Sequence, residues 1–245
     1  MPRFFVAGSN LAGGVALIAG EDAEHIRVLR MKIGERLVVC DGAGKEYDCR
    51  LTKLGDGVAE AEIEAERVSP AEPSLRCVVL AAFPKGDKAE YIVQKCTECG
   101  ASEIVFFPAY RCVAKPEGKS LERKLSRWQR IAAEAAKQSG RGIVPEVKAV
   151  EDFGQMLEAG VKQALKLFLY EAGERTPILS AVAENPAAGS CALVTGPEGG
   201  FENHEVELAR RLGFTICSMG PRILRCETAP VVALTAVLCG TGNLD

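Results

Sequence analysis

The chain has 245 residues, of which 47% are hydrophobic and 26% are charged, and its formal net charge is -3. This length allows one or two domains with real hydrophobic cores, and the apolar content excludes a disordered chain. No run reaches the roughly 18 uninterrupted apolar residues of a membrane span, and the first residues lack the apolar core of a signal peptide, so we expect a cytoplasmic protein.

The first part of the chain alternates short apolar runs with glycine and aspartate turns, which is typical of a small β-barrel. Residues 41–44 (DGAG) indicate a hairpin, and residues 21–29 are the one helix expected in this part. The expected strands are Phe4–Val6, Val15–Ile18, Leu37–Cys40, Tyr47–Leu51 and Val58–Glu64. Pro70 and Pro73 then disfavour any regular element, so we predict a barrel domain of residues 1–70 and a second domain of residues 74–245.

From Ser74 onward, apolar β-type runs alternate with helical segments, which indicates an α/β domain whose mostly parallel sheet is covered by helices on both faces. The expected strands are Arg76–Ala82, Ile104–Pro108, Leu165–Tyr170, Cys191–Thr195 and Phe214–Ser218. The expected helices are Asp87–Cys99, Leu121–Gln138, His204–Leu212 and Glu227–Cys239.

Ten cysteines are spread over the chain among apolar segments, which predicts reduced, buried thiols rather than a disulfide scaffold. Cys96 and Cys99 have the spacing of a metal or redox pair. No second pair follows them, and His25 and His204 are distant in the sequence, so we predict no metal site.

Basic residues are concentrated between Arg111 and Arg141, where nine Lys or Arg residues accompany only three Glu residues. This surplus is a possible phosphate-binding surface, although a solvated helix face explains many such runs. The overall charge gives no sign of nucleic-acid binding, and charge alone leaves both interpretations open.

A glycine-rich loop, residues 196–200 (GPEGG), lies between an expected strand and an expected helix. Loops in this position bind ligands in open parallel sheets, although three glycines would equally suit a structural tight turn. Glu198 and Glu202 would repel phosphate, and no βα unit opens with a complete phosphate or dinucleotide fingerprint, so we exclude those two classes of enzyme. For the helix that follows, Asn203 is a better capping type than Glu202.

A second loop, residues 219–230 (MGPRILRCETAP), also joins an expected strand to an expected helix. The GPEGGF and GPRILRCETA segments together closely resemble those of the knotted SPOUT methyltransferases, specifically the 16S rRNA (uracil(1498)-N(3))-methyltransferase family. The resemblance extends through the chain and includes HIRVLR at 25–30, KGDK at 85–88, QKCTE at 94–98 and QSGR at 138–141. Cys99, Met219 and Cys226 depart from the family pattern, each by a swap between side chains of similar size.

The resemblance implies a PUA-like, RNA-binding β-barrel followed by a SPOUT α/β domain whose carboxyl-terminal segment forms a deep trefoil knot. It implies that S-adenosyl-L-methionine is the methyl donor and that 16S rRNA, or the small ribosomal subunit, is the partner. The product would be N3-methylated uridine 1498, in standard numbering. Knotted enzymes of this type generally pair through the knot region, so a homodimer is expected as well.

The resemblance also implies a cofactor site formed by the two loops and nearby residues. The implied cofactor-binding residues are Tyr170, Thr195, Gly196, Glu198, Gly199, Gly200, Met219, Gly220, Ile223, Leu224, Thr228 and Ala229. Backbone groups of the loops would hydrogen-bond the adenine, and apolar side chains would pack against it. Glu198 would either lie near the sulfonium or anchor its loop to backbone N–H groups.

Arg225 and Arg141, both in family-like motifs, are the implied catalytic residues. Uracil N3 must lose a proton before it is methylated, and an arginine would stabilise the anion or position a phosphate. For Arg225 the alternative is a salt bridge with Glu227 or a neighbouring residue. The implied RNA-binding residues are Arg27, Arg30, Arg111, Arg123, Arg127 and Arg141.

Two other functions fit the same sequence. A non-catalytic ribosome-assembly factor would keep the fold, but we would expect its cofactor loops to be damaged, and here they are intact. A knotted methyltransferase acting on another rRNA or tRNA base would share the cofactor loops, because these loops report the donor and not the acceptor.

Overall fold

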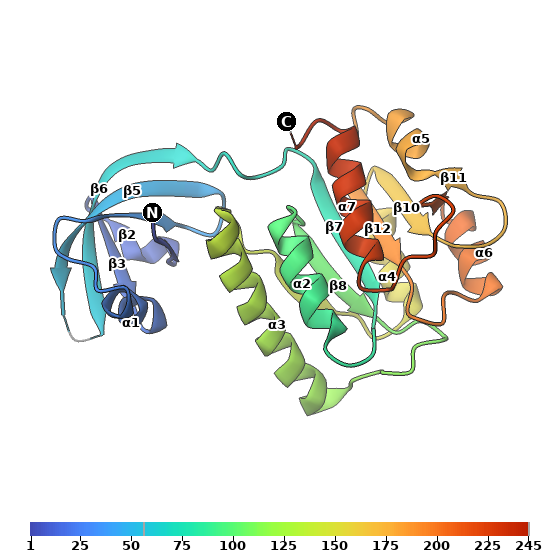
Figure 1. Ribbon diagram of the computed structural model, residues 1–245, viewed down its shortest axis with the longest axis horizontal. Helices are drawn as coiled ribbons and strands as arrows, with labels where there is room; N and C mark the ends of the chain where they lie inside the picture. The colour runs from blue at the N-terminus through green and yellow to red at the C-terminus, as the bar shows by residue number, and fades with distance from the viewer. Residues whose placement is uncertain (56, 245) are drawn as a thin grey trace. The chain divides into compact units, whose positions relative to one another are not determined.

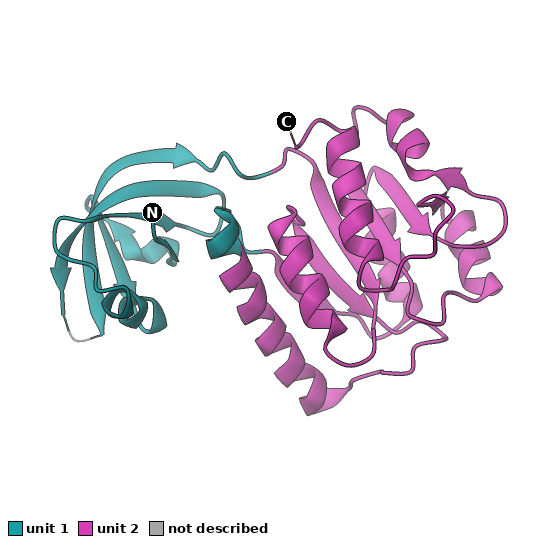
Figure 2. Ribbon diagram, in the orientation of Figure 1, with its two compact units in different colours: residues 1–72, 136–144 teal, residues 73–135, 145–245 magenta. Residues whose placement is uncertain are grey.

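The computed structural model describes residues 1–55 and 57–244, which form two compact units. Unit 1 comprises residues 1–72 and 136–144, and unit 2 comprises residues 73–135 and 145–245 (Figure 2). The sequence placed residues 136–144 in the second domain, whereas in the structure they pack with the barrel residues. Unit 1 is therefore assembled from two segments that lie far apart in the sequence.

Unit 1 is a six-stranded sheet with the strand order β1-β4-β5-β6-β3-β2. Its strands are β1 (Arg3–Phe5), β2 (Leu11–Ala12), β3 (Val15–Ala19), β4 (Arg36–Cys40), β5 (Lys45–Leu54) and β6 (Val58–Val68). The 3₁₀ turn η1 (Gly8–Asn10) and the helix α1 (Glu21–Val28) complete it. The β1–β4 pair is parallel and the others are antiparallel. Phe4, Ile18, Ile26, Leu37 and Leu51 form the centre of its core, because alternate residues of each strand point inward.

Unit 2 contains a seven-stranded, all-parallel sheet with the order β11-β13-β10-β12-β7-β8-β9. Its strands are β7 (Arg76–Ala82), β8 (Glu103–Phe107), β9 (Glu146–Ala149), β10 (Leu165–Leu169), β11 (Thr176–Pro177), β12 (Ser190–Thr195) and β13 (Thr215–Ser218). The central strands β7 and β12 are buried along almost their whole length. Such continuous burial is expected where helices cover both faces of a sheet.

Helices cover both faces of this sheet (Figure 1). They are α2 (Lys88–Glu98), α3 (Gly118–Ser139), α4 (Phe153–Val161), α5 (Ile178–Ala183), α6 (Asn203–Arg211) and α7 (Ala229–Gly240). Phe106 of β8 contacts Trp128 of α3, and the next residue, Phe107, contacts Phe153 of α4. Since successive strand residues point to opposite faces, α3 and α4 lie on opposite sides of the sheet. The last turn of α3 belongs to unit 1.

Five phenylalanine rings form a connected cluster on the α4 side of the sheet. Its members are Phe107, Phe153, Phe168, Phe201 and Phe214. They come from β8, α4, β10, the loop before α6 and the residue before β13. This cluster joins the central strands to the segment that contains the glycine-rich loop.

The strands and helices predicted for the α/β domain are all present, with ends shifted by a few residues. The prediction from the sequence did not include β9, α4, β11 and α5, which are short elements. Of the two candidates for the cap of α6, Glu202 is the N-cap residue, although Asn203 is the better capping type. Asn203 instead accepts a hydrogen bond from the Tyr170 hydroxyl at 3.0 Å. Glu202 and Glu205 form a capping box, in which the Glu205 carboxylate accepts the backbone N–H of Glu202 at 2.9 Å and the Glu202 side chain accepts that of Glu205.

All ten cysteines are free thiols, and eight of them are buried, as predicted. Cys99 is half-buried and Cys239 is exposed. Within residues 1–55 and 57–244, no three His, Cys, Asp or Glu side chains gather in a way that could hold a metal ion. In the same ranges no helix has the length and apolar character needed to cross a bilayer.

Gly160 of α4 tests how tightly the helix packs on the sheet. A Cβ atom there would lie 2.5 Å from Phe214 Cζ and 3.2 Å from Leu80 Cδ1. We therefore expect Gly160→Ala to lower the free energy of unfolding by about 1–3 kcal/mol in urea denaturation, although alanine is the better helix former. Gly189→Ala is the control, because nothing lies within 4 Å of its Cβ position. A Gly160→Ala protein more stable than the wild type would contradict the packing.

Candidate functional site

Loops at the carboxyl ends of β10, β12 and β13 surround a cavity of about 510 Å3 in unit 2. Ten of the twelve residues that the sequence implied as cofactor ligands line this cavity, namely Tyr170, Thr195, Gly196, Glu198, Gly200, Met219, Gly220, Ile223, Leu224 and Ala229. Gly199 and Thr228 are not part of its lining. The sheet therefore brings together two loops that are about twenty residues apart in the sequence, at the edge where parallel sheets bind ligands.

Phe201 anchors the glycine-rich loop at this edge. Its ring is 2% exposed and lies 4.3 Å from that of Phe168, between ring centroids. A Cβ atom on Gly196 would lie 3.0 Å from the Phe201 ring, and one on Gly200 would collide with the Glu171 carboxylate. Gly200 also has a φ of 66°, which a glycine adopts without strain. Both glycines are therefore needed for the loop to pass this close to its neighbours.

Glu198 anchors the same loop through hydrogen bonds. Its Oε1 accepts the Lys88 ammonium at 2.8 Å and the backbone N–H of Lys85 at 3.1 Å. Burial alone would raise the pKa of Glu198, but these hydrogen bonds outweigh it and lower the pKa to about 2. Of the two roles that the sequence left open for Glu198, this geometry supports the anchoring one.

Lys88 lines the cavity and is a residue that the sequence analysis did not single out, although it lies in the family-like KGDK segment. The hydrogen bond to Glu198 is the main reason that its pKa rises to about 12. Its Nζ also lies 3.4 Å from Glu227 Oε2. Burial raises the pKa of the neighbouring Cys226 thiol to about 12, so this thiol stays protonated at neutral pH. The cluster is thus a fixed ion-pair network and contains no group ready to take a proton.

Thr195 presents a polar group without a partner at the floor of the cavity. Its Oγ1 is buried, and no described residue hydrogen-bonds to it. A buried hydroxyl without a partner costs about 1–3 kcal/mol, so such a group usually indicates a missing ligand or water. Leu169, Phe201 and Leu224 supply apolar surface in the same cavity. This combination of apolar walls and one unsatisfied polar group suits a heterocyclic ligand.

Arg225 is exposed and lines the cavity. The structure contradicts the alternative in which it pairs with Glu227, because Lys88 occupies that carboxylate. No ion pair to Arg225 is present among residues 1–55 and 57–244. Its guanidinium is therefore available to a ligand at the mouth of the cavity.

The predicted RNA-binding arginines of unit 2 differ in their surroundings. Arg111 donates to Glu202 Oε1 and to the Gly199 carbonyl, both at 2.9 Å, and so braces the glycine-rich loop. Arg127 pairs with Glu90 at 2.8 Å. Arg123 is exposed and makes no ion pair with the described part of the chain. Of these three side chains, Arg123 is the one most open to a phosphate.

In unit 1, Arg27 and Arg30 lie at and just beyond the end of α1. Arg27 pairs with Glu24 at 3.2 Å and donates to the carbonyl of Gly55. Arg30 is exposed and has a φ of 55°, the one positive φ of a non-glycine residue among those described. This conformation ends α1 as a left-handed cap, because the backbone N–H groups of Arg30 and Met31 donate to the carbonyls of Arg27 and Ile26, at 2.9 and 3.2 Å.

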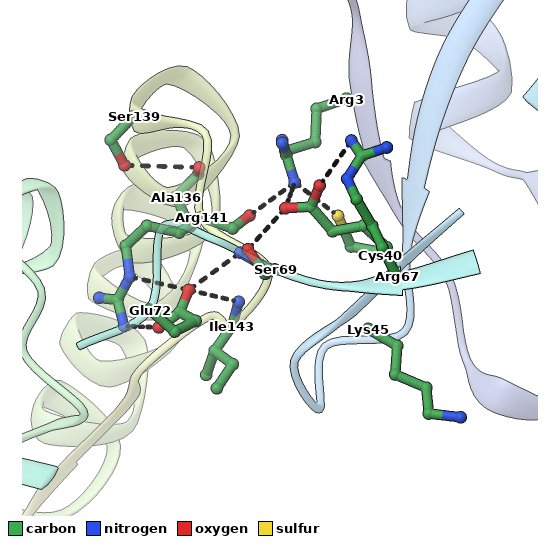
Figure 3. A network of polar contacts seen from close by, with 12 residues as sticks. Arg3, Cys40, Lys45, Arg67, Ser69, Glu72, Ala136, Ser139, Arg141 and Ile143 are labelled. Carbon is green, nitrogen blue, oxygen red and sulfur yellow. Dashed lines mark hydrogen bonds and ion pairs between the residues drawn. The ribbon is translucent and has the colours of Figure 1, made fainter. Parts of the chain in front are cut away.

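Arg141 belongs to unit 1 and is buried, with its side chain 3% exposed. Its guanidinium donates to both oxygens of Glu72, at 3.3 and 2.6 Å (Figure 3). The Oε1 of Glu72 also accepts the backbone N–H groups of Gly142 and Ile143, at 2.9 and 3.1 Å. This geometry gives Arg141 a structural role, because it fastens residues 136–144 to the end of the barrel segment. Arg141 and the cavity that Arg225 lines belong to different units.

Glu46 forms the second half of this network, also in unit 1, and its donors Arg3, Arg67 and Ser69 are labelled in Figure 3. It is fully buried, and its carboxylate accepts hydrogen bonds from Arg3 at 2.6 Å, Ser69 at 2.5 Å and Arg67 at 2.9 Å. Burial would raise the pKa of Glu46, but these donors lower it overall. Arg3 also donates to the Arg141 carbonyl at 3.3 Å. The hydrogen bonds of Glu46 and those of Glu72 therefore belong to one connected network.

Comparisons with known proteins agree with this arrangement. A family profile described as an RNA methyltransferase domain matches residues 71–238, and one described as an RNA methyltransferase PUA domain matches residues 18–64. The ribosomal RNA small subunit methyltransferase E of Bacillus subtilis (strain 168) is 38% identical over 226 residues, which cover 90% of this chain and 88% of that protein. The enzyme of the same name from Mycobacterium tuberculosis is 33% identical and covers 99% of this chain and 93% of its own.

A solved structure is similar over nearly the whole chain. It is the crystal structure of a ribosomal RNA small subunit methyltransferase E from Neisseria gonorrhoeae bound to S-adenosyl methionine. The two chains share 30% identity with a TM-score of 0.84, and the match covers 97% of each.

Arg141 and Arg225 make a matched pair for testing which arginine is structural. Removing one partner of a buried ion pair strands the other charge, so we expect Arg141→Met to lower the free energy of unfolding by about 3 kcal/mol. Arg225→Met removes an exposed side chain and should change it by less than about 0.5 kcal/mol. Urea denaturation followed by circular dichroism measures both. An Arg141→Met protein as stable as the wild type would contradict the structural role of Arg141.

Proposed function

Because this chain belongs to the family of ribosomal RNA small subunit methyltransferases E, we propose that it transfers the methyl group of S-adenosyl-L-methionine to N3 of a uridine in 16S rRNA. The uridine is the one at position 1498 in standard numbering. The observation that carries the proposal is the cavity of unit 2, where two family-like loops meet beside the unpartnered Thr195 hydroxyl. The donor bound there would supply an electrophilic methyl group on a positively charged sulfur.

The residues of the cavity fit this donor. Leu169, Ile223 and Leu224 offer apolar contacts for the adenine ring, and the backbone groups of Gly196 and Gly220 can approach it closely. The Thr195 hydroxyl would satisfy its hydrogen-bonding capacity on a polar atom of the ligand. The cavity also contains the exposed carboxylate of Glu171, which suits a ligand with a positive centre. We assign these residues to binding the donor.

We assign Arg225 to stabilising the reacting uracil. The N3–H bond must lose its proton before N3 can attack the methyl carbon, and the negative charge then spreads over O2 and O4. Glu198 is too weak a base, with a pKa of about 2, so we infer that the proton passes to water. A guanidinium beside a ring oxygen stabilises the anion. Three exposed arginines line the cavity without an ion pair to the described residues, namely Arg175, Arg222 and Arg225, and we assign the role to Arg225 because the family resemblance implies it. Alignment of N3 with the methyl carbon would supply much of the remaining rate.

The RNA would be bound by both units. In unit 1 we propose Arg30 and Arg27, at the end of α1, and in unit 2 we propose Arg123 and Arg127 of α3. Arg111 would act indirectly, because its contacts with Glu202 and Gly199 hold the loop. Binding through arginines and phosphates should weaken as the salt concentration rises.

We further propose a trefoil knot at the carboxyl-terminal end and a homodimer. The support for the dimer is the apolar character of α7 and α5, where Val232 is 39% exposed and Leu179 is 57% exposed. The two helices contact one another, so these exposed apolar side chains lie on neighbouring elements. A second copy of the chain would bury such a surface.

Calorimetric titration with S-adenosyl-L-methionine tests the location of the donor site. A Cβ atom at Gly199 would lie 3.0 Å from Arg111 Cβ, so the branched side chain of Gly199→Val must displace the loop. We expect this variant to bind the donor at least about tenfold more weakly, because overpacking of this kind costs roughly 1–3 kcal/mol. Gly189→Ala is again the control. Unchanged affinity in Gly199→Val would place the donor elsewhere.

Deletion of the gene tests the acceptor. The modified uridines of small-subunit rRNA are mapped in the deletion strain and after complementation with wild-type or Arg225→Ala protein. We expect N3-methyluridine to disappear on deletion and to return with the wild type, whereas Arg225→Ala should lower kcat on isolated subunits by about 100-fold or more. N3-methyluridine that persists after deletion would exclude the proposed acceptor. Loss of a different modified base would indicate another RNA target.

A further inference from the structure

Unit 2 contains a second cavity, with a volume of about 930 Å3, that shares no described lining residue with the first. It lies at the carboxyl ends of β7, β8 and β9, where Phe83, Pro108 and Val150 line it. The first cavity lies at the carboxyl ends of β10, β12 and β13, so both occupy the same edge of one parallel sheet. Residues 196–205 separate them: Glu198 lines the first cavity, and His204 and Glu205 line the second.

Two aromatic side chains that contact one another, Tyr110 and His204, line the second cavity. Tyr110 is 68% exposed, and its ring meets that of His204 edge to face, with 5.7 Å between centroids and an interplanar angle of 89°. Beneath them lies Glu205, which is 3% exposed. One carboxylate oxygen of Glu205 accepts the backbone N–H of Tyr110 at 3.0 Å, and the other accepts that of Glu202 at 2.9 Å.

Further hydrogen bonds hold the turn after β8, which contains Tyr110. Arg111 adds hydrogen bonds to Glu202 and to the Gly199 carbonyl, and Cys112 Sγ accepts the backbone N–H of Ala109 at 3.3 Å. A buried carboxylate and an arginine thus fix the turn after β8 against the start of α6. These contacts hold the backbone of Tyr110, whose side chain is exposed at the cavity, and an exposed aromatic ring at a held position suits the stacking of a planar ring.

The charged side chains around the second cavity indicate which kind of planar ligand would bind there. Four carboxylates and one lysine, Lys115, are found in the described lining. Glu205 is already engaged, but the exposed Glu117 and Glu151 would repel a phosphate and would accept hydrogen bonds from N–H groups. Carboxylates pair in this way with the exocyclic amino groups of nucleobases. The cavity therefore suits a base that carries an amino group, with its phosphates kept outside.

We propose that the second cavity binds an unpaired base of the RNA substrate, one that carries an exocyclic amino group and stacks on Tyr110, while the target uridine lies at the mouth of the first cavity, beside Arg225. Single-stranded RNA is generally recognised by stacking unpaired bases on aromatic side chains and by hydrogen bonds to their edges. The inference rests on the proposed function, because it takes RNA as the substrate. It adds a specificity site for a nucleotide near the target.

Fluorescence anisotropy with labelled oligocytidylate and oligouridylate of about 12 nucleotides, at one fixed salt concentration, tests the proposal. The two bases are of similar size, and cytosine carries an amino group where uracil carries an oxygen. We expect Tyr110→Ala to raise the Kd for oligocytidylate about tenfold and to leave the Kd for oligouridylate nearly unchanged. Tyr110→Phe keeps the ring and should bind both like the wild type.

Tyr91→Ala is the matched control, because Tyr91 is an exposed tyrosine of α2 that lines neither cavity. It should bind oligocytidylate like the wild type. An unchanged Kd for oligocytidylate in Tyr110→Ala overturns the proposal. An equal loss of affinity for both oligonucleotides also overturns it, because the base would then not be selected by its amino group.

A second measurement separates this inference from the proposed function. In methyl transfer to unmethylated small ribosomal subunits, Tyr110→Ala should raise KM for the subunit about tenfold while the Kd for S-adenosyl-L-methionine stays unchanged. A wild-type protein that methylates no subunit contradicts the proposed function. A wild-type protein that methylates normally, with Tyr110→Ala equal to it in KM, contradicts the second cavity alone.

Discussion

The ring of Phe201 packs among the phenylalanines of unit 2 directly after the glycine-rich loop, and both cavities depend on this contact. Burial of such a ring stabilises by roughly 1.5–3 kcal/mol, which is enough to hold a loop whose glycines would otherwise leave it mobile. Glu198, three residues before Phe201, lines the first cavity, and His204, three residues after it, lines the second. A change in the position of Phe201 would therefore move the walls of both cavities.

Three carboxylates complete this anchoring, and each ties the segment to a different partner. Glu198 binds the region between β7 and α2, Glu202 binds Arg111 after β8, and Glu205 binds the backbone of Tyr110. Together they hold the segment against the loops of the two neighbouring strands. A cavity preformed in this way loses less conformational entropy when a ligand binds, which favours affinity without additional contacts. The same ties explain three of the acidic residues near a site proposed for an RNA enzyme, because Glu198, Glu202 and Glu205 bind the protein itself.

The sequence predicted much of the fold because the apolar runs of β7, β10 and β12 and the amphipathic pattern of α3 are local signals. It missed α4 and α5, which are only nine and six residues long and whose stability depends on packing against the sheet. The two loops were recognisable from their residues, whereas the role of Lys88 was not. Its partners, Glu198 and Glu227, are more than one hundred residues away, and no local pattern reports such a contact.

The two arginines proposed as catalytic from the sequence illustrate what a motif leaves undecided. Both lie in family-like segments, yet the guanidinium of Arg141 donates hydrogen bonds to Glu72, while Arg225 is exposed at a cavity. A cation can stabilise a transient anion only if its hydrogen-bond donors are not already occupied by a permanent one, because exchanging partners would strand the first carboxylate in a buried place. The importance of Arg141 can then come from holding residues 136–144 in unit 1, without any contact with the substrate. Burial and partner occupancy, rather than residue type, therefore assign the two arginines to different tasks.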